Sequence, residues 1–162
     1  MQAELVYIDA VLPQGAFVQD TVSLLQLEWF EVNKKRLTRA TTTTTGQTLL
    51  MELEKGLEWC SGDGLFHEGK LIATIAIKPT LTICFNPVNK VQAADFSYYL
   101  GNRHLPLFME TDRAMYRVPY DGRLYEQLLA KFQSQVQLED GILLSENLVK
   151  RLMKKSRNEN EL

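Results

Sequence analysis

The 162-residue chain is poor in the side chains that most catalytic and metal sites need, with only two histidines and two cysteines. Two cysteines cannot form the disulfide framework typical of small secreted domains. The longest aliphatic run, Leu71 to Ile77, is far shorter than the ~20 residues that span a bilayer. The first ten residues include Glu4 and Asp9 and no basic region followed by an apolar run, as a secretory signal would require. We therefore expect a cytoplasmic protein with no membrane partner.

An excess of positive charge is also absent. The chain has 18 lysines and arginines against 20 aspartates and glutamates, which gives a formal net charge of −2. This balance provides no global positive field to attract a polyanion, so no nucleic-acid partner is predicted. The composition, 45% apolar and 23% charged, is that of an ordinary soluble globular protein.

The familiar catalytic motifs are missing from the sequence. There is no G-x-S-x-G nucleophile elbow, no G-x-x-x-x-G-K-[ST] phosphate loop and no G-x-G-x-x-G. Gly62-Asp63-Gly64 is interpreted as a tight turn, because glycine and aspartate tolerate turn dihedrals. Cys60 and Cys84 lie far apart in the sequence and are interpreted as buried thiols. Any histidine-dependent catalytic group would have to use His67 or His104. We predict that the protein is not an enzyme.

Period-two alternation of apolar residues predicts strands in the first half of the chain. It is clear over residues 25–30 and again over residues 71–77. Thr41 to Thr45 are interpreted as a surface strand, because threonine is β-branched. No stretch of ten residues in this half carries the apolar stripe of a helix. Residues 1–77 are predicted to form a small all-β domain.

The character of the sequence changes at Lys78-Pro79. Strands, helices and turn signals then follow in the order β-α-β-β-α-β, which is the pattern of a ferredoxin-like domain, with Asp121 as the cap of the second helix. We predict an α+β protein in which this domain occupies residues 78–141. Residues 142–162 are predicted to form a C-terminal helix and tail, with Ser145 as the cap of the helix.

The first helix of this domain is expected to begin at Asn86-Pro87 and to end at Gly101. It has two apolar stripes, one of Val91, Ala94 and Tyr98 and one of Ala93, Phe96 and Leu100. A helix with two apolar stripes is buried on more than one side, here against a sheet and against a partner chain.

His104 follows this helix in the run Gly101-Asn102-Arg103-His104. A neutral imidazole is the commonest transition-metal ligand, but one histidine cannot form a metal site. In a dimer with its two-fold axis near His104, each subunit would supply one nitrogen to a shared ion. The alternative is structural: His104 hydrogen-bonds a carbonyl at the helix end, Asn102 forms a turn and Arg103 is a solvated charge.

The run Tyr98-Tyr99-Leu100-Gly101-Asn102-Arg103-His104-Leu105-Pro106-Leu107 resembles the signature of the UreE family, the nickel metallochaperones among the urease accessory proteins. Three further segments, residues 25–29, 35–46 and 56–65, resemble the N-terminal domain of that family. The resemblance continues in order from about residue 20 to residue 140. It implies a β domain that binds a protein partner, followed by a ferredoxin-like domain that dimerises and binds metal.

The resemblance further implies that His104 is the metal ligand, with Ni(II) as cargo. Tyr98, Asn102 and Arg103 match the motif and are expected to pack the interface or to position the imidazole. The partners implied are a second copy of the chain, the urease-associated GTPase and the apo-urease accessory complex. Zn(II) or Cu(II) are expected to bind in vitro, and the Irving–Williams order favours Cu(II) over Ni(II).

The chain departs from the family pattern at its end, because residues 147–162 contain no histidine whereas many members have a histidine-rich tail. We therefore expect a carrier of few ions. His67 matches no family ligand and is interpreted as a surface histidine. Two other functions stay open. One is a protein-interaction module in which His104 is structural, and the other is a metal-dependent hydrolase with water activated on an ion at His104.

Overall fold

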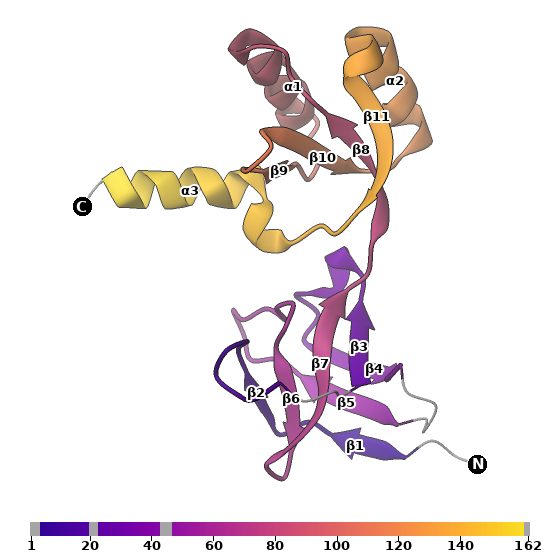
Figure 1. Cartoon of the computed structure of the whole chain (residues 1–162), viewed down its shortest axis with the longest axis vertical. Coiled ribbons are helices and arrows are strands. Elements are labelled where there is room, and N and C mark those ends of the chain that lie inside the picture. Colours follow the sequence, from indigo (N-terminus) through magenta and orange to yellow (C-terminus); the bar gives the residue numbers. More distant parts are fainter. Residues whose placement is uncertain (1–3, 20–22, 43–46, 161–162) are drawn as a thin grey trace. The chain divides into compact units, whose positions relative to one another are not determined.

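The computed structural model describes residues 4–19, 23–42 and 47–160. The chain divides into two compact units, Met1–Lys78 and Pro79–Leu162. Figure 1 shows that the described residues form both helices and strands, which confirms the predicted α+β class. No helix among the described residues is long and apolar enough to cross a membrane.

The described residues of the first unit form two sheets, with strand orders β1-β5-β4 and β2-β6-β7-β3. Their buried faces carry apolar residues at alternate positions, such as Leu25 and Leu27 of β3 and Leu49 and Met51 of β5. The strands are β1 (Leu5–Tyr7), β2 (Ala10–Leu12), β3 (Ser23–Leu27), β4 (Arg36–Ala40), β5 (Thr48–Glu52), β6 (Gly64–His67) and β7 (Lys70–Ile77).

Two strand predictions in this unit are wrong. β3 ends at Leu27, and Trp29–Glu31 forms a 3-10 turn, η1, because the Glu31 carboxylate accepts the Glu28 N–H at 2.9 Å and so turns the chain. β4 ends at Ala40, so Thr41 and Thr42 lie outside a strand. Thr43 to Thr45 lie outside the described residues.

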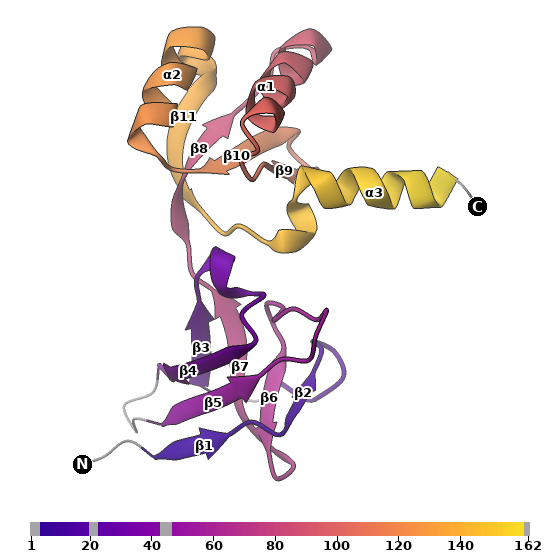
Figure 2. The ribbon, with the colours of Figure 1, turned by 180° about the vertical axis from the view of Figure 1, so that it is seen from behind.

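The second unit contains one antiparallel sheet with the strand order β11-β8-β10-β9. Figure 2 shows the sheet and helices of this unit from behind. The elements are β8 (Thr80–Phe85), α1 (Lys90–Asn102), β9 (Phe108–Glu110), β10 (Met115–Pro119), α2 (Gly122–Phe132), β11 (Val136–Gly141) and α3 (Val149–Asn160), with 3-10 turns η2 (Gln133–Gln135) and η3 (Ser145–Asn147).

Helices α1 and α2 pack on the same face of this sheet. Ile83 and Phe85 of β8 join a buried cluster with Phe96 and Leu100 of α1 and with residues of α2. The rings of Phe85 and Phe96 are stacked, with centroids 4.0 Å apart and planes only 5° from parallel. This packing holds the C-terminal half of α1 against the sheet, and so determines where the chain leaves the helix.

The limits of the helices differ in part from the prediction. Helix α1 begins at Lys90, because it is Asn89 rather than Asn86 whose side chain accepts an N–H of the first turn, that of Gln92 at 2.8 Å. Asp121 caps α2 as predicted, accepting the Leu124 N–H at 2.9 Å. Ser145 does not cap α3, because it lies in η3, which precedes the helix.

Candidate metal-binding site at the end of helix α1

Helix α1 ends in a Schellman motif rather than at Gly101. The His104 N–H donates to the Gly101 carbonyl at 3.0 Å, and the Leu105 N–H donates to the Leu100 carbonyl at 3.3 Å. This pair of bonds makes Arg103 the C-cap and His104 the residue after it. Leu105 packs against the cluster that contains Leu100, which supplies the apolar contact usual in this motif. The predicted end at Gly101 is therefore wrong.

His104 itself has the left-handed backbone conformation, with φ of 55°. This position of the motif usually carries glycine, because a side chain there is strained. His104 is exposed, and within the described residues its imidazole has no hydrogen-bond partner. The hydrogen bond of His104 to a carbonyl at the helix end is made by its backbone N–H, to Gly101. Glu68, Ala114 and Gln133 also have a positive φ.

The neighbouring Arg103 is held back against α1. Its guanidinium carbon lies 3.5 Å from the centroid of the Tyr99 ring, and its Nη1 donates to the Tyr99 carbonyl at 3.1 Å. The ammonium of Lys131 lies 4.7 Å from the same centroid and pairs with Asp95 at 2.9 Å. Arg103 is thus an ordered side chain rather than a freely solvated charge.

The two predicted stripes of α1 have different environments. Phe96 and Leu100 are fully buried against the sheet, whereas Val91 and Tyr98 are 79% and 72% exposed. Ala94, between them, is exposed as well. An apolar stripe therefore runs along the outer side of α1 toward the end at which His104 lies.

The described residues do not bring other metal-ligating side chains to His104. No group of three or more His, Cys, Asp or Glu side chains among them could hold a metal ion. His67, in the other unit, has its Nδ1 2.7 Å from the Tyr7 carbonyl oxygen. A carbonyl oxygen only accepts, so Nδ1 carries a proton in this arrangement.

The two cysteines have different environments, so the prediction that both are buried is wrong for Cys60, which is exposed. Cys84 is buried, and burial raises the pKa of its thiol. A metal-binding cysteine must be a thiolate. Cys84 is therefore suited to packing rather than to ligating a metal.

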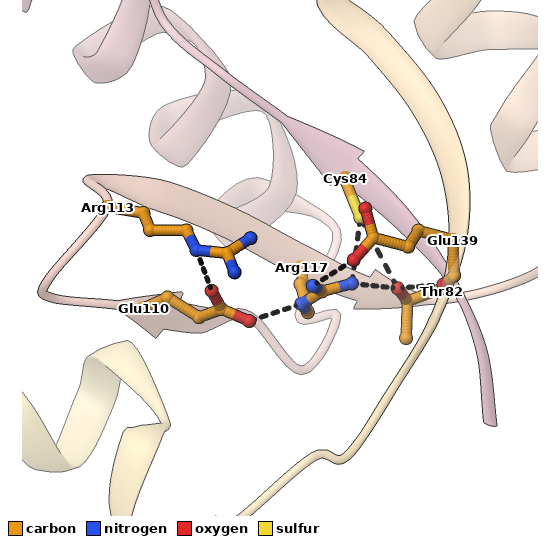
Figure 3. A network of polar contacts seen from close by, with 6 residues as sticks. All are labelled: Thr82, Cys84, Glu110, Arg113, Arg117 and Glu139. Atoms are coloured by element: carbon orange, nitrogen blue, oxygen red, sulfur yellow. Dashed lines mark hydrogen bonds and ion pairs between the residues drawn. The ribbon is translucent and has the colours of Figure 1, made fainter. Parts of the chain in front are cut away.

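Sequence reasoning did not find a polar cluster centred on the buried Arg117, on the sheet face opposite α1 and α2 (Figure 3). Its guanidinium donates to Glu110 at 2.7 Å and to Glu139 at 2.8 Å, and also to Thr82 and Cys84. Burial opposes the charge, but the bonds to Glu139 and Glu110 raise the pKa of Arg117. The alternation of side chains along each strand could have placed these residues on one face of the sheet. It could not have predicted which of them pair with Arg117.

This cluster is structural rather than a second functional site. Both terminal nitrogens and Nε of Arg117 already donate hydrogen bonds, and no buried side-chain nitrogen or oxygen among the described residues lacks a partner. The cluster also explains why position 141 is a glycine, because a Cβ there would lie 2.8 Å from an Arg117 nitrogen.

The fold and this site define an α+β protein that presents one strained, solvent-exposed histidine at the end of a helix. Comparison with models of known protein families finds no match. The chain is similar to proteins named urease accessory protein UreE. It is 32% identical over 108 residues to that of Acetivibrio thermocellus, covering 67% of this chain and 68% of the relative.

Two further relatives carry the same name. The protein of Haemophilus influenzae strain PittEE is 28% identical over 123 residues, or 76% of this chain and 65% of the relative. The protein of Flavobacterium johnsoniae is 24% identical over 123 residues, or 76% of this chain and 73% of the relative. The chain therefore belongs to the UreE family of urease accessory proteins. The match to the Haemophilus protein spans less than two thirds of that relative's length.

Proposed function

We propose that this protein is a cytoplasmic nickel carrier for urease maturation, without catalytic activity of its own. In this proposal, two copies of the chain associate so that both His104 side chains bind one Ni(II) ion. The ion is cargo and is passed on for assembly of the urease active site. The urease-associated GTPase and the apo-urease accessory complex are the proposed acceptors, because the relatives are named as urease accessory proteins.

The observation that carries the proposal is the setting of His104. The imidazole is exposed, has no hydrogen-bond partner within the described residues, and stands on a backbone conformation that strains it. One imidazole leaves most positions of a Ni(II) ion open, because its preferred geometries need at least four ligands. A second copy supplies the next nitrogen, and water or the acceptor supplies the rest.

The exposed stripe of α1 supports the homodimer. Val91 and Tyr98 are large apolar side chains that face solvent in the single chain. In the dimer this stripe is buried against the second copy, and the contact brings the two ends of α1 together. With such a two-fold contact, a chain that has a single suitable histidine forms a site with two histidine ligands, one from each copy.

The arrangement of strands and helices within each unit supports a more detailed assignment of the fold. We assign the second unit as a ferredoxin-like domain, because its sheet has the order β11-β8-β10-β9 with α1 and α2 on one face. We assign the first unit, built from β1 to β7, as an all-β domain that binds a protein partner. Dimerisation and nickel binding belong to the ferredoxin-like domain.

An open coordination sphere also explains how the ion is released. An acceptor protein can add its own ligands to the exposed ion before the two imidazoles leave, so that nickel is never free in solution. Acidification should weaken binding, because a protonated imidazole has no lone pair for a metal. Affinity alone would favour Cu(II), so delivery to urease rests on recognition of the acceptor.

Calorimetric titration of the protein with Ni(II), combined with its mass in solution, tests the proposal. We expect about half an equivalent per chain for a dimer with a shared site. His104→Ala should abolish this binding and leave the dimer intact. His67→Ala is the matched control, because it removes the only other histidine, and it should bind nickel normally.

The possible outcomes separate the three functions. Equal nickel binding by the wild type and His104→Ala would overturn the shared site. Partner binding that is unchanged in His104→Ala, without any nickel in the wild type, would indicate an interaction module. Hydrolysis that depends on added metal and on His104 would indicate an enzyme.

A further inference from the structure

Helix α3 differs from the other two α-helices of its unit, because no residue of Val149–Asn160 is buried. It is joined to the sheet of its unit at its start, where the Val149 N–H donates to the Leu107 carbonyl at 2.9 Å and Leu148 forms a bridge with Phe108. Both ribbon views show α3 running outward from η3 (Figures 1 and 2). The helix is therefore a projecting arm.

One side of this arm is apolar and open. Val149, Leu152 and Met153 follow one another at helical spacing, and the Met153 side chain is 52% exposed. Next to the sheet, this side borders a groove of about 360 Å³ lined by Met109, Val149, Leu152, Met153, Ser156 and Arg157. The described residues leave the outer part of this apolar side uncovered.

The arm is also strongly basic. Residues 149–160 contain five basic side chains, Lys150, Arg151, Lys154, Lys155 and Arg157, against one acidic side chain, Glu159. Within the described residues, Lys150, Lys154, Lys155 and Arg157 form no ion pair. Lys150 and Lys154 are four residues apart, as are Arg151 and Lys155, so like charges repel along the helix.

A helix with these properties is poorly supported by the chain itself. Isolated helices below ~12–15 residues are marginal in water. Here only Val149 and Leu152 are partly buried, and Glu159 is the one acidic side chain among five basic ones in residues 149–160. A negatively charged partner would remove the repulsion, and an apolar contact would cover Leu152 and Met153. Both missing interactions can be supplied by the same partner surface.

We propose that α3 is a docking helix for an acidic protein partner. The partner surface is a groove with an apolar floor for Leu152 and Met153 and a rim of carboxylates for Lys150, Lys154 and Lys155. A membrane surface is disfavoured, because interfacial helices carry a wider apolar face with aromatic residues, and residues 149–160 contain none. Nucleic acid is disfavoured by the net charge of −2. This proposal does not depend on nickel binding at His104.

The test uses the full-length protein and three labelled probes: a synthetic amphipathic peptide of glutamate and leucine, phosphatidylserine vesicles and a duplex DNA. At about 0.15 M salt, we expect the protein to bind the peptide more tightly than the vesicles or the DNA. The double variant Lys154→Glu, Lys155→Glu should weaken peptide binding by about tenfold or more. Leu152→Ser with Met153→Ser should weaken it as well.

The matched control is Lys55→Glu with Lys70→Glu, which changes the net charge equally at two exposed positions of the first unit. It should leave peptide binding unchanged. Because α3 has no buried residue, these variants should fold normally, and circular dichroism checks this. Peptide binding that survives the α3 charge reversal would overturn the proposal, and so would tighter binding to the vesicles or the DNA.

Discussion

The backbone N–H of His104 donates a hydrogen bond to the carbonyl oxygen of Gly101 at 3.0 Å. The sequence prediction assigned the end of the helix to the glycine, but the left-handed residue is the histidine, with φ of 55°. The candidate metal ligand therefore occupies a position where glycine would be more stable. Stability and the proposed function oppose one another at this residue, and the opposition can be measured.

His104→Gly should be more stable than His104→Ala by about 1 kcal/mol, because only the alanine variant keeps a Cβ in the left-handed conformation. Thermal unfolding without metal measures the difference. Both variants should lose nickel binding, since both lack the imidazole. An alanine variant as stable as the glycine variant would show that position 104 is not left-handed in solution.

Asn89→Ala should destabilise the protein by about 0.5–2 kcal/mol, because the first turn of α1 loses the side chain that accepts the Gln92 N–H. Asn86→Ala is the matched control and should have little effect, because the Asn86 side chain caps no helix. Urea unfolding of both variants measures this. The reverse order of effects would restore the original prediction that α1 begins at Asn86-Pro87.

Gly141→Ala should cost about 1–3 kcal/mol. The added Cβ would lie 2.8 Å from Nη1 and 3.0 Å from the central carbon of Arg117, and Glu110 and Glu139 hold that guanidinium in place. Gly101→Ala is the control. Its Cβ meets nothing within 4 Å, so it should be neutral or stabilise the helix. Equal costs at both positions would show that Arg117 can move aside.

Glu31→Gln should reduce the free energy of unfolding at neutral pH by about 1–3 kcal/mol. It should also make that free energy depend less on pH in the acidic range. Burial alone would raise the pKa of Glu31, but the Glu28 N–H, Arg39 and Lys34 together lower it below 4.5. Because the folded-state pKa is the lower one, the stabilisation is complete above about pH 4.5 and is lost as the pH falls through the folded-state value.

Denaturant unfolding of the wild type and Glu31→Gln between neutral and acidic pH checks this prediction. The two proteins should converge in stability at the acidic end. Glu52→Gln is the control, because the Glu52–Arg36 pair is solvent-exposed on both sides and should contribute less than about 1 kcal/mol. A difference between wild type and Glu31→Gln that does not change with pH would show that the Glu31 charge is not responsible.

Local patterns predicted the kinds of element well. Apolar alternation indicated strands such as β7, and Asp121 marked the start of α2, because both signals depend on residues close together in the chain. The two apolar stripes of α1 were also visible in the sequence. The sequence did not show which stripe the sheet would cover, because that depends on the position of the sheet that buries Phe96 and Leu100.

Residue patterns alone predicted an α+β chain with few ligating side chains, and they singled out His104 because it follows the end of a helix. The remaining features depend on tertiary contacts. Leu105 is partly buried against the cluster that contains Leu100, and this packing, rather than the glycine at position 101, accompanies the left-handed conformation of His104. Likewise, Arg117 is surrounded by Thr82, Glu110 and Glu139 only because the four strands β8 to β11 pair in one sheet, which no local pattern encodes.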